Sequence, residues 1–271
     1  MTDASMSAAV EALEQTWRST AALCHDLTDE EWAKPTGCPG WTVQDQLSHL
    51  VGLERVLMGD PHPDDPVPDA PHIRDEVGRW MEAHVAQRRG RHPNDVLAEF
   101  EAMINERVPQ LRSLAEAGDP DAEMTGPMGF PAKAGSMIGI RVLDSWVHEQ
   151  DIRRAVGKPG GYEGGAAQIT LDRFVSGLGF VIGKKVAPPD GTAVTFIVEG
   201  PIARTLTVSV NDGRAEVSQD EVTPVAQAIL RMSTETFVGL MAGREGAADG
   251  VTIDGDEDLG RRIVENMAVT P

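Results

Sequence analysis

The sequence is poor in cysteine, in aromatic residues and in positive charge. Its 271 residues include only two cysteines, Cys24 and Cys38, which allow one disulfide but exclude a disulfide framework. Lys and Arg number 24 against 43 Asp and Glu, and the net charge of −19 argues against nucleic acid or an anionic membrane as a partner. No apolar run has the length of a membrane span, and the opening MTDASMSAAVEALEQ is polar, unlike a secretory leader. We therefore expect a cytoplasmic protein with reduced thiols.

Up to about residue 157, apolar residues recur with helical spacing. Thr42 is a candidate helix cap, with Asp45 three residues later as its capping-box partner. Polar segments rich in Pro and Gly separate the helical stretches. This pattern indicates four or five helices, with candidates at 8–27, 42–58, 76–89, 96–117 and 136–156. Short connections favour antiparallel packing, and we assign residues 1–157 to an up-and-down four-helix bundle.

The second half has a different pattern. GKPGGYEGG, residues 157–165, is a flexible joint, and a helical segment follows at 167–183. Alternating runs rich in β-branched residues then flank Asn211-Asp212-Gly213, which indicates a β-hairpin. AQAILRMS fits either a third strand or the start of a helix, and the last residues predict a strand, a turn and a final helix. We assign residues 166–271 to a small α+β domain.

A carboxylate and an imidazole lie four residues apart in RVLDSWVHEQDI, so Asp144 and His148 share one side of a helix. Ile140 and Ile152 flank them in the same i±4 row, which predicts a buried face. Burying both polar groups without partners would cost several kcal/mol, about 2–7 for each even when uncharged. A divalent metal would satisfy both groups, and a simple Asp–His hydrogen bond is the alternative.

A metal site needs a third ligand from another helix. His62, His72 and His92 sit beside prolines in polar loops, where we expect them to be solvated. His84 shares a helical stripe with apolar residues, which favours a satisfied core histidine. His49 lies in QLSHLVGLERVL, which is apolar over most of its circumference. Periodicity does not decide whether His49 or His84 is the third ligand.

Two motifs resemble a known family. CPGWTVQDQLSHLVGLE is similar to the loop and second helix of the mycothiol-dependent maleylpyruvate isomerase family, and RVLDSWVHEQDIRRAVG is similar to its last bundle helix. RMSTETFVGLMAGR and VTIDGDEDLGRRIVENM resemble its C-terminal domain. The resemblance implies a DinB-like metal-binding bundle followed by a sterol-carrier-protein-like α+β domain.

The family's ligand pattern, transferred to this chain, implies a metal held by His49, Asp144 and His148. The isomerase itself has a Glu where this chain has Asp144, which is one methylene shorter. Two imidazoles and one carboxylate leave open positions on the ion, as catalytic sites do, and Zn²⁺ is the first choice. The resemblance further implies mycothiol as cosubstrate.

The implied reaction is attack of a metal-held thiolate on a small electrophile. If the thiol is later expelled, the enzyme is a maleylpyruvate isomerase, and if it is retained, the enzyme is a thiol S-transferase. Two other hypotheses stay open: a non-catalytic metal- or ligand-binding module of the same fold, and a metal-dependent hydrolase. A hydrolase would need a general base, for which Glu149 and Asp151 are the candidates.

Other residues have weaker indications. Asp151 either orients His148 or pairs with Arg154, and Arg141 either pairs with Asp144 or is exposed. Trp41 is a core residue or lines the pocket, and Cys38, in the preceding loop, is a packed thiol or a nucleophile. In the second half, Arg231 and Arg244 are candidates for binding carboxylates of the thiol or substrate, with a surface role as the alternative.

Three roles are open for the second half of the chain. It binds the thiol, closes the site, or forms a homodimer.

Overall fold

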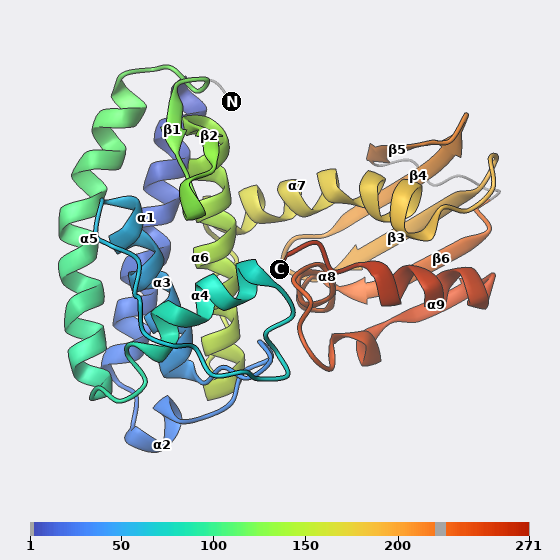
Figure 1. Cartoon of the computed structure of the whole chain (residues 1–271). Coiled ribbons are helices and arrows are strands. Elements are labelled where there is room, and N and C mark those ends of the chain that lie inside the picture. Colours follow the sequence, from blue (N-terminus) through green and yellow to red (C-terminus); the bar gives the residue numbers. More distant parts are fainter. Residues whose placement is uncertain (1–2, 220–225, 271) are drawn as a thin grey trace. The chain divides into compact units, whose positions relative to one another are not determined.

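The computed structural model describes residues 3–219 and 226–270, and the chain divides into two units, residues 1–170 and 171–271. Figure 1 shows long helices in the first part of the chain and a sheet with helices in the second. This is the predicted fold class, a helical bundle followed by an α+β unit. In the described part of the chain, no helix combines the length and the apolar character needed to cross a bilayer.

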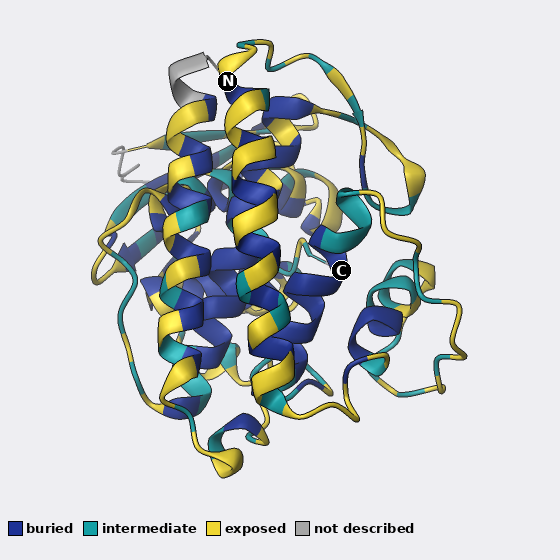
Figure 2. Cartoon of the chain, turned by 90° about the vertical axis from the view of Figure 1, so that its left-hand side faces the viewer, coloured by how far each residue is buried: buried dark blue, intermediate teal, exposed yellow. Residues whose placement is uncertain are grey.

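Four long helices form the bundle of the first unit. Helix α1 packs against α5 and α6, and α3 packs against α4, α5 and α6. Figure 2 shows exposed residues along the outer side of the long helices and buried residues on their inner side, as expected of amphipathic helices. The helices are α1 (Asp3–His25), α2 (Asp29–Trp32), α3 (Val43–Leu57), α4 (Glu76–Ala86), α5 (Pro93–Glu116) and α6 (Ala134–Val156), with a short hairpin of β1 (Glu123–Thr125) and β2 (Pro131–Lys133) before α6.

Local sequence explains where these helices begin and end. The hydroxyl of Thr42 accepts a hydrogen bond from the Asp45 backbone N–H, and the Asp45 carboxylate accepts one from the Thr42 N–H. This is the predicted capping box, and it fixes the start of α3 at Val43, six residues before His49. At the other end of the unit, Gly157 adopts the left-handed conformation that terminates α6.

The helix directions differ from the strict alternation that we predicted. Side-chain contacts pair Gln44 with Arg91 and Glu54 with Arg107, so α3 and α5 run in the same direction. The long segment that contains α4 carries the chain back to the end where α3 begins, and this crossover makes a parallel pair possible. In contrast, α3 and α6 are antiparallel, because Gln46 contacts His148 and Glu54 contacts Arg141.

Ile140 is a second correction. We placed it on a buried face, but it is 41% exposed, whereas Ile152 is fully buried. At about 100° per residue, four residues advance by about 400°, so an i±4 row drifts by about 40° at each step. The row that carries Asp144 and His148 therefore starts at the edge of the core and turns into it.

The second unit is built on a mixed five-stranded sheet in the order β5-β4-β3-β6-β7. Strands β3 and β6 are parallel, and the other neighbours are antiparallel. The predicted hairpin is confirmed: β4 ends at Asn211, and Asp212 and Gly213 take the positive φ values of a two-residue turn. AQAILRMS forms a strand. The elements are α7 (Gly165–Phe180), which spans the division between the units, a helical turn Val181–Val186, β3 (Ala193–Glu199), β4 (Arg204–Asn211), β5 (Arg214–Gln219), β6 (Ala228–Ser233), α8 (Thr234–Met241), β7 (Thr252–Gly255) and α9 (Glu257–Asn266).

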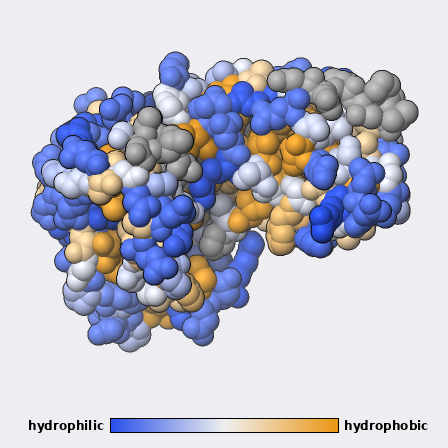
Figure 3. Space-filling view, turned by 90° about the horizontal axis from the view of Figure 1, so that it is seen from above, coloured by the Kyte–Doolittle hydropathy of each residue, from blue (hydrophilic) through white to orange (hydrophobic). Residues whose placement is uncertain are grey.

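Figure 3 shows how hydrophilic and apolar residues are distributed over one face of each unit. Hydrophilic residues cover most of the helical unit there, and broader apolar areas lie over the second unit. Within the described residues, the large apolar side chains that are most exposed are Phe130, Ile140, Phe180 and Val269.

Candidate metal centre

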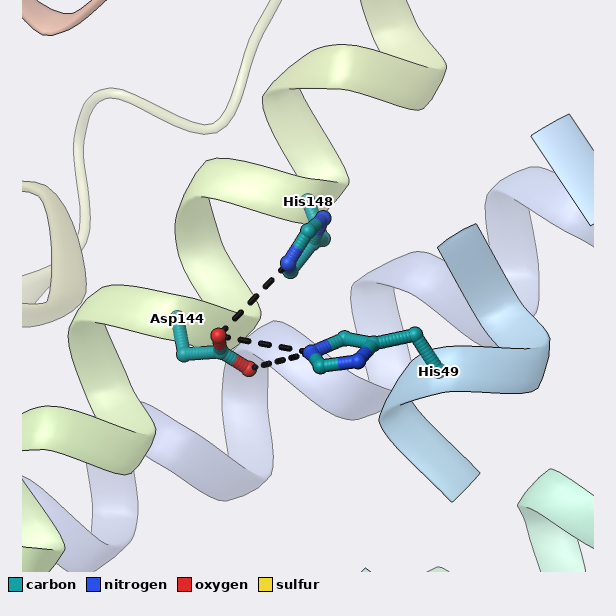
Figure 4. A group of neighbouring side chains, drawn as sticks. All are labelled: His49, Asp144 and His148. Atoms are coloured by element: carbon teal, nitrogen blue, oxygen red, sulfur yellow. Dashed lines mark hydrogen bonds and ion pairs between the residues drawn. The ribbon is translucent and has the colours of Figure 1, made fainter. Parts of the chain in front are cut away.

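Three side chains from two antiparallel helices converge inside the bundle. His49 comes from α3, and Asp144 and His148 come from adjacent turns of α6 (Figure 4). The Nε2 atom of His49 lies 3.4 and 3.3 Å from the two carboxylate oxygens of Asp144, and Nε2 of His148 lies 3.5 Å from Oδ1. One ligand atom from each residue falls within 4.8 Å of the other two.

These spacings fit a shared cation better than a network of direct hydrogen bonds. An N–H···O hydrogen bond typically spans about 2.7–3.2 Å, so all three contacts are long. Ligand atoms about 2.0–2.1 Å from a tetrahedral ion are separated from one another by about 3.3 Å. The two His–Asp spacings therefore suit a small divalent ion, and the third pair of ligand atoms lies within 4.8 Å.

The orientation of His148 leaves the correct nitrogen free for a metal. Its Nδ1 contacts Oε1 of Gln46, and a carbonyl oxygen can only accept a hydrogen bond, so Nδ1 carries the proton. Gln46 is held in this orientation because its Nε2 donates to the Thr36 hydroxyl at 2.6 Å. The lone pair of His148 Nε2 thus faces Asp144. Sequence reasoning missed Gln46, because its partner His148 lies on another helix.

Asp151 pairs with Arg154, which is one of the two roles that the sequence left open, and its role in orienting His148 stays a prediction. One carboxylate oxygen lies 3.6 Å from Nδ1 of His148, and the other pairs with Arg154. Its side chain is completely buried. We therefore expect this carboxylate to help keep the proton on Nδ1 of His148, while Arg154 offsets its charge.

The Trp41 ring lies against both imidazoles. Its ring centroid is 5.1 Å from that of His49 and 5.8 Å from that of His148. The indole N–H donates to Glu82 of α4 at 2.8 Å, and His72 contacts the same carboxylate oxygen at 3.0 Å. His72 is thus held by Glu82 and is not simply solvated, which corrects our expectation.

Close packing beside Trp41 also explains why residue 40 is a glycine. Gly40 has φ +76°, and a Cβ atom there would lie 2.2 Å from Nδ1 of His72. Only glycine accommodates both the backbone conformation and the approach of the imidazole. The Gly-Trp turn thereby places Trp41 over the two histidines.

At neutral pH, His49 and Asp144 have the protonation states that metal ligands need. Burial lowers the pKa of His49 to about 4, an effect that the nearby Asp144 only partly opposes. Burial alone would raise the pKa of Asp144, but Arg141, His49 and His148 together hold it well below its usual range. His49 is therefore neutral and Asp144 is ionised. In addition, Nδ1 of His49 is buried without a hydrogen-bond partner among the described residues.

Arg141 is buried and pairs with Asp144, which is one of its two predicted alternatives. Its Nη1 donates to Oδ2 of Asp144 at 2.9 Å, and its Nε donates to Glu54 at 2.6 Å. Glu54 also accepts from Nε of Arg107 at 2.9 Å. Sequence reasoning did not single out Glu54 or Arg107.

His84 does not join this group. It is only 1% exposed, as expected for a core residue, but neither ring nitrogen has a hydrogen-bond partner within the described part of the chain. Our expectation of a satisfied core histidine is therefore wrong. Burial lowers its pKa to about 3, with smaller contributions from His49, His62 and Arg88.

These two histidines predict how stability depends on pH in the metal-free protein. Both pKa values are lowered from 6.5 on folding, so below about pH 6.5 the unfolded chain binds protons that the folded chain does not. Stability should therefore fall as the pH drops from about 6.5 towards 4, by about 1.4 kcal/mol per pH unit for each imidazole.

Urea unfolding at several pH values in a chelating buffer measures this slope. His84→Met should reduce it by about half, because one of the two imidazoles is gone. His25→Ala is the control, since the His25 side chain is 56% exposed. Equal slopes for the wild type and His84→Met would contradict the prediction.

The remaining predicted site residues lie elsewhere in the chain. Arg231 is on β6, about half exposed, 3.3 Å from Asp254, and Arg244 follows α8 and donates to the backbone carbonyl of Ala242 at 2.6 Å. Their role in binding the thiol or substrate stays a prediction. Neither cysteine forms a disulfide, and Cys24 is buried whereas Cys38 is partly exposed.

Fold and site together define a helical bundle with a candidate three-ligand metal centre, followed by an α+β unit. The N-terminal domain of mycothiol maleylpyruvate isomerase matches residues 13–153, and the C-terminal domain of the same family matches residues 168–262. The chain belongs to the mycothiol maleylpyruvate isomerase family, as the motifs predicted.

Individual relatives are more distant. Two proteins named as uncharacterized, from two strains of Mycobacterium tuberculosis, are 30% identical over 145 residues, which is 50% of this chain and 51% of theirs. The chain thus spans about half the length of the curated relatives it matches. The crystal structure of the mycothiol-dependent maleylpyruvate isomerase is similar to this chain, with a TM-score of 0.57 and 14% sequence identity over 92% of each chain. The structure of a single-residue mutant of that enzyme gives the same values. These matches show the fold.

Proposed function

We propose that this protein is a divalent-metal- and mycothiol-dependent enzyme that adds a thiolate to a small electrophile. The observation that carries the proposal is the convergence of His49, Asp144 and His148 at spacings that fit a single ion. Family membership supplies the thiol, since the family is described by its use of mycothiol. Zn²⁺ suits a set of two imidazoles and one carboxylate.

The chemical need for a metal follows from the acidity of thiols. With a pKa near 8.5, a free thiol is only about 3% ionised at pH 7. A divalent ion held by the three side chains would supply the positive charge that keeps the thiol deprotonated at neutral pH. Three protein ligands leave at least one position open for this purpose.

The protein's own residues prepare this centre. Gln46 and Asp151 keep the proton of His148 on Nδ1, so that Nε2 is available. Arg141 keeps Asp144 ionised and oriented. Trp41 covers the imidazoles on one side, which limits the access of water there.

Maleylpyruvate is the substrate that the family suggests. The thiolate would add to its double bond, forming a C–S bond and moving the electron pair towards the conjugated carbonyl group. After rotation about the new single bond, the pair returns, the C–S bond breaks, and the trans isomer leaves with the thiol unchanged. If the adduct instead takes up a proton and is released, the same first step makes an S-transferase.

Turnover with and without the thiol tests the proposal. We expect zinc-loaded protein to consume maleylpyruvate only when mycothiol is present, and chromatography of the products separates the two outcomes. Appearance of the trans isomer at constant mycothiol identifies an isomerase, whereas a stoichiometric thiol adduct identifies a transferase. Equal rates without mycothiol would overturn the thiol step, and metal binding without any thiol-dependent reaction would favour a non-catalytic module.

A further inference from the structure

A buried chain of alternating charges crosses the bundle and ends at the candidate metal centre. Arg107 of α5 donates to Glu54 of α3 at 2.9 Å, Arg141 of α6 donates to the same carboxylate at 2.6 Å, and Arg141 also donates to Asp144 at 2.9 Å. The side chains of Glu54 and Arg141 are 0% and 2% exposed, and that of Arg107 is 7% exposed. Three of the four long helices thus share one polar network.

Stability alone is a weak explanation for this network. Removing charged groups from water is expensive, and well-packed apolar residues often replace a buried ion pair at no loss of stability. In addition, only one end of the network reaches the candidate metal centre. Arg107 lies at the end away from the three converging side chains, whereas Asp144 is one of them. The geometry therefore connects Glu54 and Arg107 to the orientation and charge of Asp144.

The position of Arg141 creates an electrostatic problem that Glu54 solves. A guanidinium beside Asp144 repels a cation and competes with it for the carboxylate. Glu54 neutralises this guanidinium and anchors it through Nε, so only Nη1 engages Asp144, at Oδ2. The two positive and two negative groups of the chain cancel, and Asp144 retains Oδ1 for an ion.

We propose that Glu54 and Arg107 are positioning residues that set the metal affinity of the His49, Asp144 and His148 group, with opposite signs. Glu54 promotes metal binding because it restrains and neutralises Arg141. Arg107 opposes binding because it draws on the charge of Glu54. This inference rests on the proposed function, since it assumes that the group binds a divalent ion.

Two charge-removing variants separate this role from a structural one. Glu54→Gln leaves Arg141 uncompensated and should weaken Zn²⁺ binding by about 10-fold or more, the range found for residues that orient metal ligands. Arg107→Met removes the second cation from Glu54, so that this carboxylate neutralises Arg141 alone, and Zn²⁺ affinity should rise. Both variants should lower stability. Competition with a chromophoric chelator measures the Zn²⁺ affinity, and urea unfolding measures the stability.

Controls come from the same helices. Arg55 and Glu106 form a more exposed ion pair between α3 and α5, so Arg55→Met should leave Zn²⁺ affinity unchanged. Glu54→Asp keeps the charge and should retain more of the affinity than Glu54→Gln. If Glu54→Gln does not fold, Arg107→Met and Glu54→Asp still test the opposite signs.

Three results would overturn the inference. One is unchanged affinity in Glu54→Gln, and the second is equal weakening in Glu54→Gln and Arg107→Met, which is what a purely structural network predicts. The third is a wild-type protein that binds no Zn²⁺, which would remove the proposed function as well. The first two leave wild-type binding intact, so the two kinds of failure are distinguishable.

Discussion

His49→Ala should abolish the binding of the divalent ion, of which we expect the wild-type protein to carry about one per chain. His49 is the only candidate ligand of the group that α3 supplies, and its Nε2 lies 3.3 and 3.4 Å from the Asp144 oxygens. Without it, only two ligands on α6 remain, which is too few for tight binding. Elemental analysis of both purified proteins, before and after exposure to Zn²⁺ and desalting, measures the change.

The matched control for this prediction is His25→Ala, which removes a half-exposed imidazole at the end of α1. It should bind as much metal as the wild type. If His49→Ala also keeps the full amount of metal, the third ligand lies elsewhere, and His84 becomes the next residue to replace. If the wild type stays metal-free after exposure to Zn²⁺, the non-catalytic alternative gains support.

Asp144→Asn should have the second large effect, on both metal affinity and stability. The substitution removes the only negative charge of the ligand group, and Glu54 is then the one anionic partner left to the buried Arg141 among the described residues. We expect Zn²⁺ affinity to fall by at least about 100-fold and stability to fall by about 1–3 kcal/mol. The estimate for stability is modest because the Asp144 side chain is 23% exposed.

Asp144→Glu provides the matched comparison, because it keeps the charge and adds one methylene group. We expect it to bind Zn²⁺ within about 10-fold of the wild type, since the contacts of His148 with Gln46 and Asp151 are undisturbed. Chelator competition gives the affinities and urea unfolding the stabilities. Equal Zn²⁺ affinity in Asp144→Asn and the wild type would show that this carboxylate is not a ligand.

Features that depend on neighbours in the chain could be read from the sequence. The capping box of Thr42 and Asp45, the turn at Asp212 and Gly213, and the pairing of Asp144 with His148 on one side of a helix all follow from local geometry. The division into a helical first half and an α+β second half follows equally from periodicity. The motifs around His49 and His148 were specific enough to indicate the family.

Features that depend on contacts between helices needed the structure. Helix α3 is buried on almost all sides, so periodicity could not choose between His49 and His84, and only the resemblance to the family pointed to His49. The antiparallel packing of α3 against α6 brings His49 next to Asp144. Helices α3 and α5 pack in parallel because the chain crosses over through α4, and no local sequence pattern indicates such a crossover.

The groups around the three candidate ligands were hidden for the same reason. Glu54 looks like any surface Glu of a helix, and only tertiary packing shows that it is buried between Arg107 and Arg141. Gln46 gains its role because the antiparallel helix brings His148 to it. The sequence by itself determined the helices, the hairpin and the identity of the reactive side chains. Their convergence, and the charges that surround them, were decided by packing, because a residue's burial and partners depend on helices far away in the chain.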